Sequence, residues 1–246
     1  MGMLKISLPD SISHEYASGT TVGEIVRNAY GKKSGAVAAL VDGEERDFSY
    51  ILEQDCDIEP ILGDTEAGRY ILRHSCAHLL AQAVVEIYPD AQPTIGPPIE
   101  NGFYYDFKMD PVGDGDLKKI EKKMQEHIRA NHTLTREEHD NRTLRDMFAG
   151  NPFKIEIMND KIGMDIGSSA YRQGDFVDLC LGPHVPSTSY LRWFKLTGTS
   201  QAYWKGDSSK ESLVRIYGMC FSSKDELRER ERQIEEAKKR DHKKIG

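Results

Sequence analysis

Two pairs of residues in this chain have the types and the spacing of a catalytic or metal-binding site. His74 and His78 stand four residues apart in HSCAH, and Cys180 and His184 stand four residues apart in CLGPH. On a helix, residues i and i+4 lie one above the other, so the two histidines can point to one place. Three imidazoles and a thiol can hold zinc tetrahedrally or handle the water and the proton of a hydrolysis. Either pair alone is weak evidence, but together they predict one site built from two distant segments.

The neighbouring residues predict how each pair is presented. The first pair lies on a helix that Pro89 ends, and its apolar stripe consists of Leu72, Cys76, Leu79, Leu80, Ala83, Val84 and Ile87. At about 100° per residue, the histidines point almost opposite this stripe, toward solvent or a cleft. Gly182 and Pro183 exclude a plain helix for the second pair. We expect a strand end, FVDLC, to run into a turn that presents His184 as the other wall of a cleft.

The composition limits the class of protein. The 246 residues are 38% hydrophobic and 30% charged, which suits a globular protein with one large or two ordinary domains. We find no apolar run long enough to span a bilayer and no signal peptide, and the four scattered cysteines lack a C-x-x-C motif. These features predict a cytoplasmic protein with no membrane partner. A net charge of −7 argues against broad nucleic-acid binding, so any such contact should be local.

Residues 1–62 read as a small β-rich unit. LKISLP is a short strand, TTVGEIVRNAYG is a short amphipathic helix closed by Gly31, and AVAALVDGEERDFSY is a hairpin that turns at Asp42 and Gly43. A last strand lies near IEPIL. This order indicates a ubiquitin-like β-grasp fold, and GDTEAG is predicted to be a linker after it.

Residues 68–221 read as a larger α+β unit, because strands and helices mix without strict alternation. After the histidine helix we expect an aromatic strand in GFYYDFKM, a helix over DLKKIEKKMQEHIRANH, a strand, a short helix in TLRDMF, and a strand in FKIEIM. WFKLTGTSQAYWKG and SLVRIYGMCF are predicted to form a hairpin. Residues 222–246 form a charged helix, in which Ser223 and Glu226 have capping-box spacing. It is either a solvated surface helix or a connection toward a further domain.

With these motifs in place, the whole chain resembles the N-terminal part of bacterial-type threonyl-tRNA synthetases. The resemblance is carried by RHSCAHLLAQAV, TIGPPIENGFYYDF, FVDLCLGPHVPST, AYWKGDSSKESLVRIYG and KKRDHKKIG. It implies a TGS domain of β-grasp fold over 1–62, an editing domain of the threonyl/alanyl type over 68–221, and over 222–246 a linker helix toward a catalytic domain that these residues lack. It also implies that the chain hydrolyses the ester of tRNA(Thr) mischarged with serine at the acceptor end, and that the full-length enzyme is a homodimer through domains absent here.

The resemblance suggests a role for each residue of the two pairs. His74 suits water positioning or proton transfer, because imidazole titrates near neutrality. His78 and His184 would orient the water or the ribose hydroxyls. Cys180 is open to three interpretations: a nucleophile, a zinc ligand or a pocket wall. Ester hydrolysis requires no covalent step, so we rank the nucleophile last.

Three further residues complete the predicted site, and one residue departs from the family pattern. Lys154, in FKIEIM, matches the family's active-site lysine and would stabilise an oxyanion or act as a base. Asp178 precedes Cys180 by two residues and would bind the substrate ammonium. Tyr105, in GFYYD, either lines the pocket with its hydroxyl on the substrate or packs as an ordinary core aromatic. Leu181 replaces a basic residue of many relatives, which puts a local ionic contact in doubt.

We expect an editing site that needs no cofactor. Alanyl-type relatives hold zinc with the same pattern, so zinc at His74, His78, Cys180 and His184 is the alternative. A zinc-dependent editing hydrolase of the alanyl type and a non-catalytic RNA-binding module remain the competing functions. Selectivity would follow a double sieve, because one missing methyl group is worth only about 1–3 kcal/mol in a synthetic site.

Overall fold

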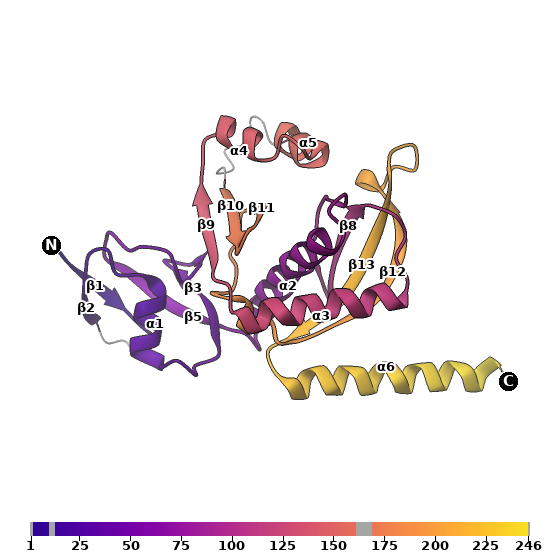
Figure 1. The fold of residues 1–246 in the computed structure, drawn as a ribbon. Helices are drawn as coiled ribbons and strands as arrows, with labels where there is room; N and C mark the ends of the chain where they lie inside the picture. The colour runs from indigo at the N-terminus through magenta and orange to yellow at the C-terminus, as the bar shows by residue number, and fades with distance from the viewer. Residues whose placement is uncertain (1, 10–12, 161–168, 246) are drawn as a thin grey trace.

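The computed structural model describes residues 2–9, 13–160 and 169–245. It is a mixed α+β protein, as predicted, and the described strands form three separate sheets. In Figure 1 the first sheet lies at the left, and the other two belong to the larger unit at the right. Within the described residues, no helix is long and apolar enough to cross a membrane.

The first sheet packs against a single helix. Its strands run in the order β2-β1-β5-β3-β4, and β1 pairs with β5 in parallel while the other neighbours are antiparallel. The elements are β1 Met3–Ser7, β2 Ser13–Ala17, α1 Val22–Tyr30, β3 Ala36–Val41, β4 Glu44–Arg46 and β5 Cys56–Leu62. A capping box of Thr21 and Glu24 starts α1, and Gly31 ends it with a positive φ of 79°. None of the residues of strand β2 is buried, so its sequence lacks the alternation of apolar and polar residues that would predict a strand.

Helix α2, Glu66–Ile87, runs through the larger unit and carries the first histidine pair (Figure 1). It begins inside GDTEAG, so the prediction of a linker there is wrong for its second half. The reason is a local cap: Thr65 Oγ1 accepts a hydrogen bond from the Gly68 N–H group at 3.1 Å. The predicted apolar stripe is buried, and the opposite face is covered as well. Three of its polar side chains are at most 5% exposed, namely Ser75, His78 and Gln82, whereas His74 is half-buried.

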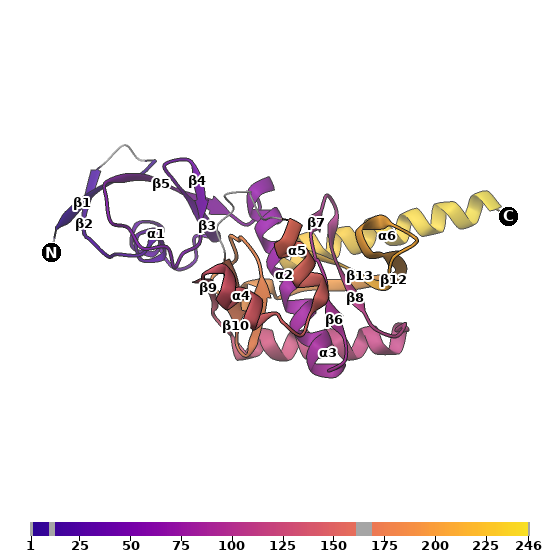
Figure 2. The ribbon, with the colours of Figure 1, turned by 90° about the horizontal axis from the view of Figure 1, so that it is seen from above.

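The stripe of α2 packs on the second sheet. This sheet has the order β12-β13-β8-β6, and β7 pairs with β8 at its edge. The elements are β6 Gln92–Pro93, β7 Pro98–Ile99, β8 Gly102–Lys108, α3 Asp114–Ala130, η1 Thr188–Leu191, β12 Trp193–Tyr203, η2 Trp204–Gly206 and β13 Ser212–Phe221. Helices α2 and α3 contact each other, and Figure 2 shows α3 below α2 in that view. Helix α6, Lys224–Ile245, leaves the end of β13, and its Glu226 N–H group donates to Ser223 Oγ as the predicted cap requires.

The third sheet covers the polar face of α2. It has the order β11-β10-β9, and it is accompanied by two short helices (Figure 1). The elements are β9 Leu134–Glu138, α4 Asn141–Met147, α5 Pro152–Asp160, β10 Ser169–Gln173 and β11 Phe176–Leu179. This sheet brings β11, and the turn that follows it, to the histidine helix.

The prediction of a strand at FKIEIM is wrong, because these residues lie in helix α5. Apolar and charged residues alternate there, which favours a strand, but a helix start precedes them. Asn151 Oδ1 accepts hydrogen bonds from the N–H groups of Phe153 and Lys154 at 3.1 and 3.2 Å, and a proline takes the first helical position. Phe153 then packs on Trp204. The cap and this contact outweigh the alternating pattern.

The two units also contact each other. The first unit has its own core around Ile6, Ile25 and Ile58. Val37 and Ile61, although they lie on its strands, belong to the core around α2. The division of the chain into two domains at residues 62 and 68 stays a prediction. The apolar contact made by Val37 and Ile61 crosses this division.

Candidate active site

The structure brings both predicted pairs together between α2 and the turn that follows β11. Cys180 Sγ lies 3.3 Å from Nε2 of His74 and 3.2 Å from Nε2 of His184. The ring centroid of His184 lies 4.4 Å from that of His74 and 4.3 Å from that of His78. One ligand atom from each of the four residues lies within 4.8 Å of the others. The covered face of α2 is therefore one wall of a cluster, and the CLGPH turn is the other.

Ser75, which the sequence analysis missed, determines the proton arrangement of His184. Its hydroxyl accepts a hydrogen bond from the Val185 N–H group at 3.1 Å and lies 2.9 Å from His184 Nδ1. Because the hydroxyl oxygen already accepts, its own proton is free to be donated to Nδ1. Nε2 of His184 then carries the proton and donates to Cys180 Sγ. We assign this tautomer from the hydrogen-bond network.

The same reasoning extends to His74. Cys180 Sγ also accepts from the Gly182 N–H group at 3.3 Å. With both of these donors directed at the sulfur, the thiol proton points to His74 Nε2, and Nδ1 of His74 carries a proton. That Nδ1 atom is buried and has no hydrogen-bond partner among the described residues. A donor of this kind can hold a substrate or water oxygen.

Side chains of two strands, β10 and β9, hold the CLGPH turn by hydrogen bonds to its carbonyl groups. Ser169 Oγ donates to the carbonyl oxygen of Cys180 at 2.5 Å, and Arg136 Nη1 donates to that of Leu181 at 2.6 Å. The Leu181 side chain is 42% exposed, so the residue that departs from the family pattern faces outward. A groove beside it has two arginines in its lining, Arg46 and Arg136, but five carboxylate residues line it as well, so it supplies no net positive charge in place of the missing basic side chain.

Tyr171 and Asp47 complete the support of the turn, and sequence reasoning missed both. The Tyr171 ring meets that of His184 edge-on, with centroids 4.4 Å apart. A Cβ at Gly182 would lie 1.9 Å from the Tyr171 hydroxyl oxygen, so only glycine fits this position. The hydroxyl donates to Asp47 Oδ2 at 2.5 Å, and Asp47 Oδ1 accepts from the His184 N–H group at 2.7 Å. Asp47 belongs to the first unit, and no local pattern marks it.

The other predicted residues form a closed network beside the cluster. Lys154 Nζ lies 2.5 Å from Asp178 Oδ1 and donates to the Tyr105 hydroxyl at 3.0 Å. Tyr105 donates in turn to Asp178 Oδ2 at 2.6 Å, which lies 3.7 Å from His78 Nδ1. These side chains are nearly inaccessible: Tyr105 is 1% exposed, Asp178 2% and Lys154 3%. Asp178, predicted to bind the substrate ammonium, has an ammonium partner within the protein.

Burial sets the charges of the cluster. It lowers the pKa of His74 to about 3 and that of His78 to about 4, against the opposing effect of Asp178. It also lowers the pKa of His184 well below the ordinary value and raises the pKa of the Cys180 thiol to about 12. At neutral pH the cluster is uncharged, and a neutral thiol is a poor nucleophile.

The ion pair beside the cluster behaves differently. Burial raises the pKa of Asp178, but the nearby Lys154 and His78 and the hydrogen bonds from Lys154 and Tyr105 outweigh it, so the pKa lies below the ordinary value. A buried carboxylate keeps its charge only beside such partners.

The four residues of the cluster also fit zinc chemically. Nitrogen and sulfur are the donors that zinc prefers, and the Nδ1 atom of His78 lies 3.7 Å from Asp178, a carboxylate that could support a ligating histidine; His184 would have to exchange its tautomer, so that Nδ1 carries the proton and donates to Ser75. A bound ion would polarise a carbonyl group or lower the pKa of a water molecule.

Comparison with known proteins agrees with this geometry. Residues 169–217 match the family described as the threonyl and alanyl tRNA synthetase second additional domain. The chain is 45% identical over 97% of its length to the threonine--tRNA ligase of Thermoplasma acidophilum, and 45% identical over 99% to that of Acetivibrio thermocellus. The corresponding protein of Staphylococcus epidermidis is 42% identical over 100% of the chain. The chain spans 35% to 39% of the length of these relatives.

Cys180 and His184 thus lie within the segment that matches the second additional domain named for threonyl and alanyl tRNA synthetases, and His74 and His78 precede that segment. Over nearly its whole length the chain is related to part of the threonine--tRNA ligases, which confirms the resemblance predicted from its motifs.

The buried histidines predict a specific loss of stability in mild acid. Each is neutral in the folded protein, so between its ordinary pKa and its lowered pKa the unfolded chain binds more protons. The free energy of unfolding should fall as the pH drops from 6.5 towards 4, by up to about 1.4 kcal/mol per pH unit for each histidine. Urea unfolding in metal-free buffer at several pH values measures this slope.

Two variants test whether the cluster causes this slope. His78→Asn should make the slope shallower by about one proton, by the linkage of proton uptake to stability. Met124→Leu changes a buried side chain that carries no titratable group, and it should leave the slope unchanged. A wild-type slope no steeper than that of His78→Asn contradicts the prediction.

Proposed function

We propose that this chain hydrolyses the aminoacyl ester of tRNA(Thr) mischarged with serine, in the cytoplasm. The observation that carries the proposal is the convergence of His74, His78, Cys180 and His184 on one uncharged cluster beside a buried ammonium. Relationship to threonine--tRNA ligases supports the choice of tRNA as substrate. The first unit is proposed to be a TGS domain of β-grasp fold, which the five-stranded sheet with one packed helix supports.

In the proposed reaction a water molecule attacks the ester carbonyl carbon, and the bond from that carbon to the ribose oxygen breaks. Serine and tRNA with a free hydroxyl group are the products. The Nδ1–H group of His74 holds the water oxygen or the ester oxygen, because its proton has no acceptor within the described protein. His78 and His184 orient the attacking water or the ribose hydroxyls. Cys180 is a hydrogen-bonded wall of the pocket.

Lys154 is proposed to stabilise the oxyanion. An ammonium group has three N–H donors, and the structure directs two of them to Asp178 and Tyr105. The third can bind the charge that develops on the carbonyl oxygen. Hydrogen-bond donors that are already in position before the reaction, in a site that excludes water, typically raise the rate by about 10²–10³-fold. Asp178 then holds Lys154 in place, in addition to any contact with the substrate ammonium.

Threonine carries one more methyl group than serine, and the pocket needs rigid walls to exclude it. Two tyrosine rings near the cluster meet this requirement, since Tyr105 and Tyr171 are 1% and 2% exposed. Backbone glycines lie against both: a Cβ at Gly96 would be 2.1 Å from the Tyr105 ring, and one at Gly182 would be 1.9 Å from the Tyr171 hydroxyl oxygen. Rings packed this closely resist displacement, which favours exclusion of one methyl group.

The hydrolysis test compares two esters and two proteins. The wild-type chain should release serine from seryl-tRNA(Thr) and spare threonyl-tRNA(Thr). His74→Ala removes the free N–H donor and should slow the release of serine by about 10²–10⁴-fold. Equal rates on both esters would sink the proposed selectivity, and an unimpaired His74→Ala would remove this residue from the mechanism.

We also propose that the reaction needs no metal. A tetrahedral zinc ion with all four residues as ligands would have no open position for water, which is the mark of a structural site. Editing should therefore survive exhaustive chelation, followed by metal analysis of the same sample. Activity that is lost on chelation and restored by zinc alone would favour the zinc-dependent alternative.

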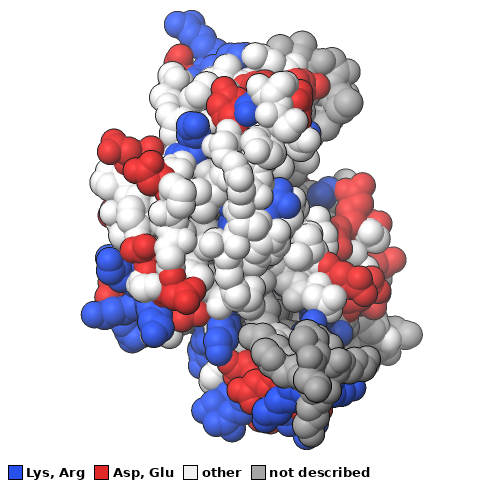
Figure 3. Space-filling model, turned by 90° about the vertical axis from the view of Figure 1, so that its right-hand side faces the viewer, with Lys and Arg blue, Asp and Glu red and all other residues white. Residues whose placement is uncertain are grey.

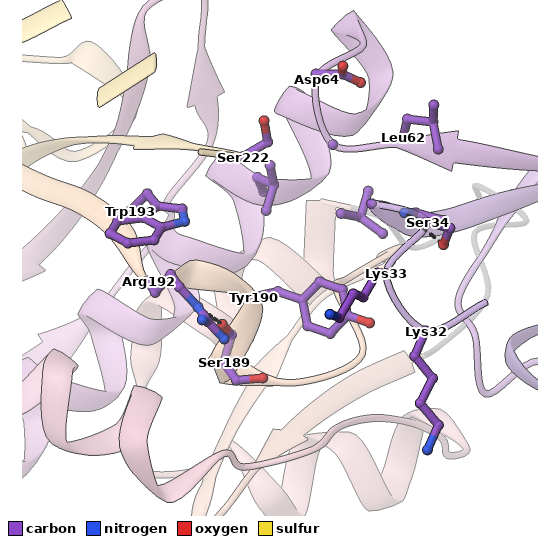
Figure 4. Close-up of a pocket in the computed structure, with 15 residues that line it drawn as sticks. Lys32, Lys33, Ser34, Leu62, Asp64, Ser189, Tyr190, Arg192, Trp193 and Ser222 are labelled. Carbon is purple, nitrogen blue, oxygen red and sulfur yellow. Dashed lines mark hydrogen bonds between the residues drawn. The ribbon is translucent and has the colours of Figure 1, made fainter. Parts of the chain in front are cut away.

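The partner RNA needs a local binding site, because charged residues of both signs mix around the face drawn in Figure 3. A groove of about 620 Å³ between the two units offers one. Figure 4 shows Lys32 and Lys33 on one side of it and Tyr190, Arg192 and Trp193 on the other. Cations bind phosphates and aromatic rings stack on bases, so this groove suits a stretch of the RNA.

Reversing the charge of the groove should weaken RNA binding. The double variant Lys32→Glu with Lys33→Glu should lower the affinity for tRNA(Thr). For each of these lysines that contacts a phosphate, its replacement should make the slope of log affinity against log salt concentration shallower by about one. Lys118→Glu with Lys119→Glu is the matched control, since these exposed lysines lie at the end of α3 away from the first unit (Figure 1). Equal losses in both double variants would contradict a role for the groove.

A further inference from the structure

We infer that Asp47, in the first unit, is a positioning residue for the catalytic turn of the second, so that the first unit completes the site. The inference rests on the proposed function for its kinetic test. The carboxylate of Asp47 accepts two hydrogen bonds from the larger unit, one from the His184 N–H group and one from the Tyr171 hydroxyl, at 2.7 and 2.5 Å. The His184 contact joins residues 137 positions apart in the chain.

The position of Asp47 is well anchored within the first unit. It directly follows β4, whose last residue, Arg46, pairs with Ala39 of β3. The next residue, Phe48, is 7% exposed and packs in the core of the first unit, and its carbonyl oxygen accepts from the Gly23 N–H group at 2.9 Å. Both neighbours of Asp47 are therefore held, and the carboxylate projects from a rigid part of the sheet.

The bonds of Asp47 satisfy groups that would otherwise be costly to bury. Asp47 is 9% exposed and His184 is 1% exposed. A buried N–H group or carboxylate without a partner costs free energy comparable to several hydrogen bonds. Pro183 has no N–H group. The His184 N–H group is therefore the backbone donor of the turn that lies nearest to the imidazole. Asp47 therefore fixes the backbone of the turn where this ring begins.

One carboxylate restrains the His184 imidazole in two ways. It holds the backbone of His184 directly, and it holds the hydroxyl of Tyr171, whose ring packs edge-on against the imidazole. The imidazole also contacts Ser75 at Nδ1 and Cys180 at Nε2, and the rings of His74 and His78 pack against it. Loss of Asp47 should shift His184 and, through Cys180 Sγ, His74. Misplacement of catalytic groups by about 1 Å can cost about 10²-fold in rate.

The test compares four variants in steady-state hydrolysis of seryl-tRNA(Thr). Asp47→Ala should lower kcat by about 10²-fold with little change in KM, since misplaced groups affect the chemical step. Asp47→Asn keeps an oxygen acceptor for the His184 N–H group and should remain within about tenfold of the wild type. Tyr171→Phe removes only one of the two bonds and should give an intermediate loss. Glu45→Ala, at an exposed position of the same hairpin, should match the wild type.

A second measurement does not depend on activity. The amide proton of His184 should resonate downfield in the wild type, because it donates to a carboxylate. The shift should decrease in Asp47→Asn, which keeps a neutral oxygen acceptor, and disappear in Asp47→Ala. If Asp47→Ala does not fold, Asp47→Asn and Tyr171→Phe still decide the matter through the same shift and the same rates.

The outcomes separate the inference from the proposed function. A wild-type chain without esterase activity removes the proposed function, and the His184 amide shift still reports the Asp47 contact. An active wild type with Asp47→Ala at full kcat overturns the inference. So does a folded Asp47→Ala in which the His184 amide resonance stays in place.

Discussion

The ion pair of Lys154 and Asp178 is the constraint on which the site and much of the larger unit depend. Neither charge can be buried alone, because an unpaired buried charge costs several kcal/mol, and removal of one partner typically costs about 3–5 kcal/mol. The pair joins α5 to β11, and Tyr105 joins both to β8 of the central sheet. Tyr105 reaches both charges only because the third sheet, with α5, docks beside the central sheet. His78, on α2, faces the same carboxylate, so this docking also places the ion pair against the cluster.

The turn at residues 180–184 also depends on polar partners from other segments. It has no regular secondary structure, and it is half-buried apart from the exposed Leu181 and the buried His184, so the polar groups of its backbone need such partners. Ser169, Arg136, Ser75 and Asp47 supply them from four different segments. Because each partner accepts or donates at one atom, the set specifies the path of the turn. The hydrogen bonds that stabilise the turn are also the ones that orient the imidazole and the thiol.

The sequence predicts the parts of this arrangement that have a local cause. Helical period and i, i+4 spacing placed His74 and His78 on one face of a helix, and a glycine and a proline marked the turn after Cys180. Strand β2 was missed because it buries no residue, and α5 was misread because its alternating residues concealed the cap at Asn151. Asp47 carries no local signal at all, since its role arises only when segments 137 residues apart meet.

The charge distribution of the site follows from this packing and limits its chemistry. Burial keeps the three imidazoles and the thiol neutral at pH 7, so the electric field at the cluster comes from charged groups beside it, among them the Lys154–Asp178 pair and the Asp47 carboxylate. A neutral cluster can orient a water molecule and a ribose but provides no thiolate for attack. The ammonium beside it can meet a developing oxyanion without moving, because Asp178 and Tyr105 already hold it. A reaction in which water attacks an ester and negative charge grows next to Lys154 therefore suits these electrostatics better than a covalent pathway through Cys180.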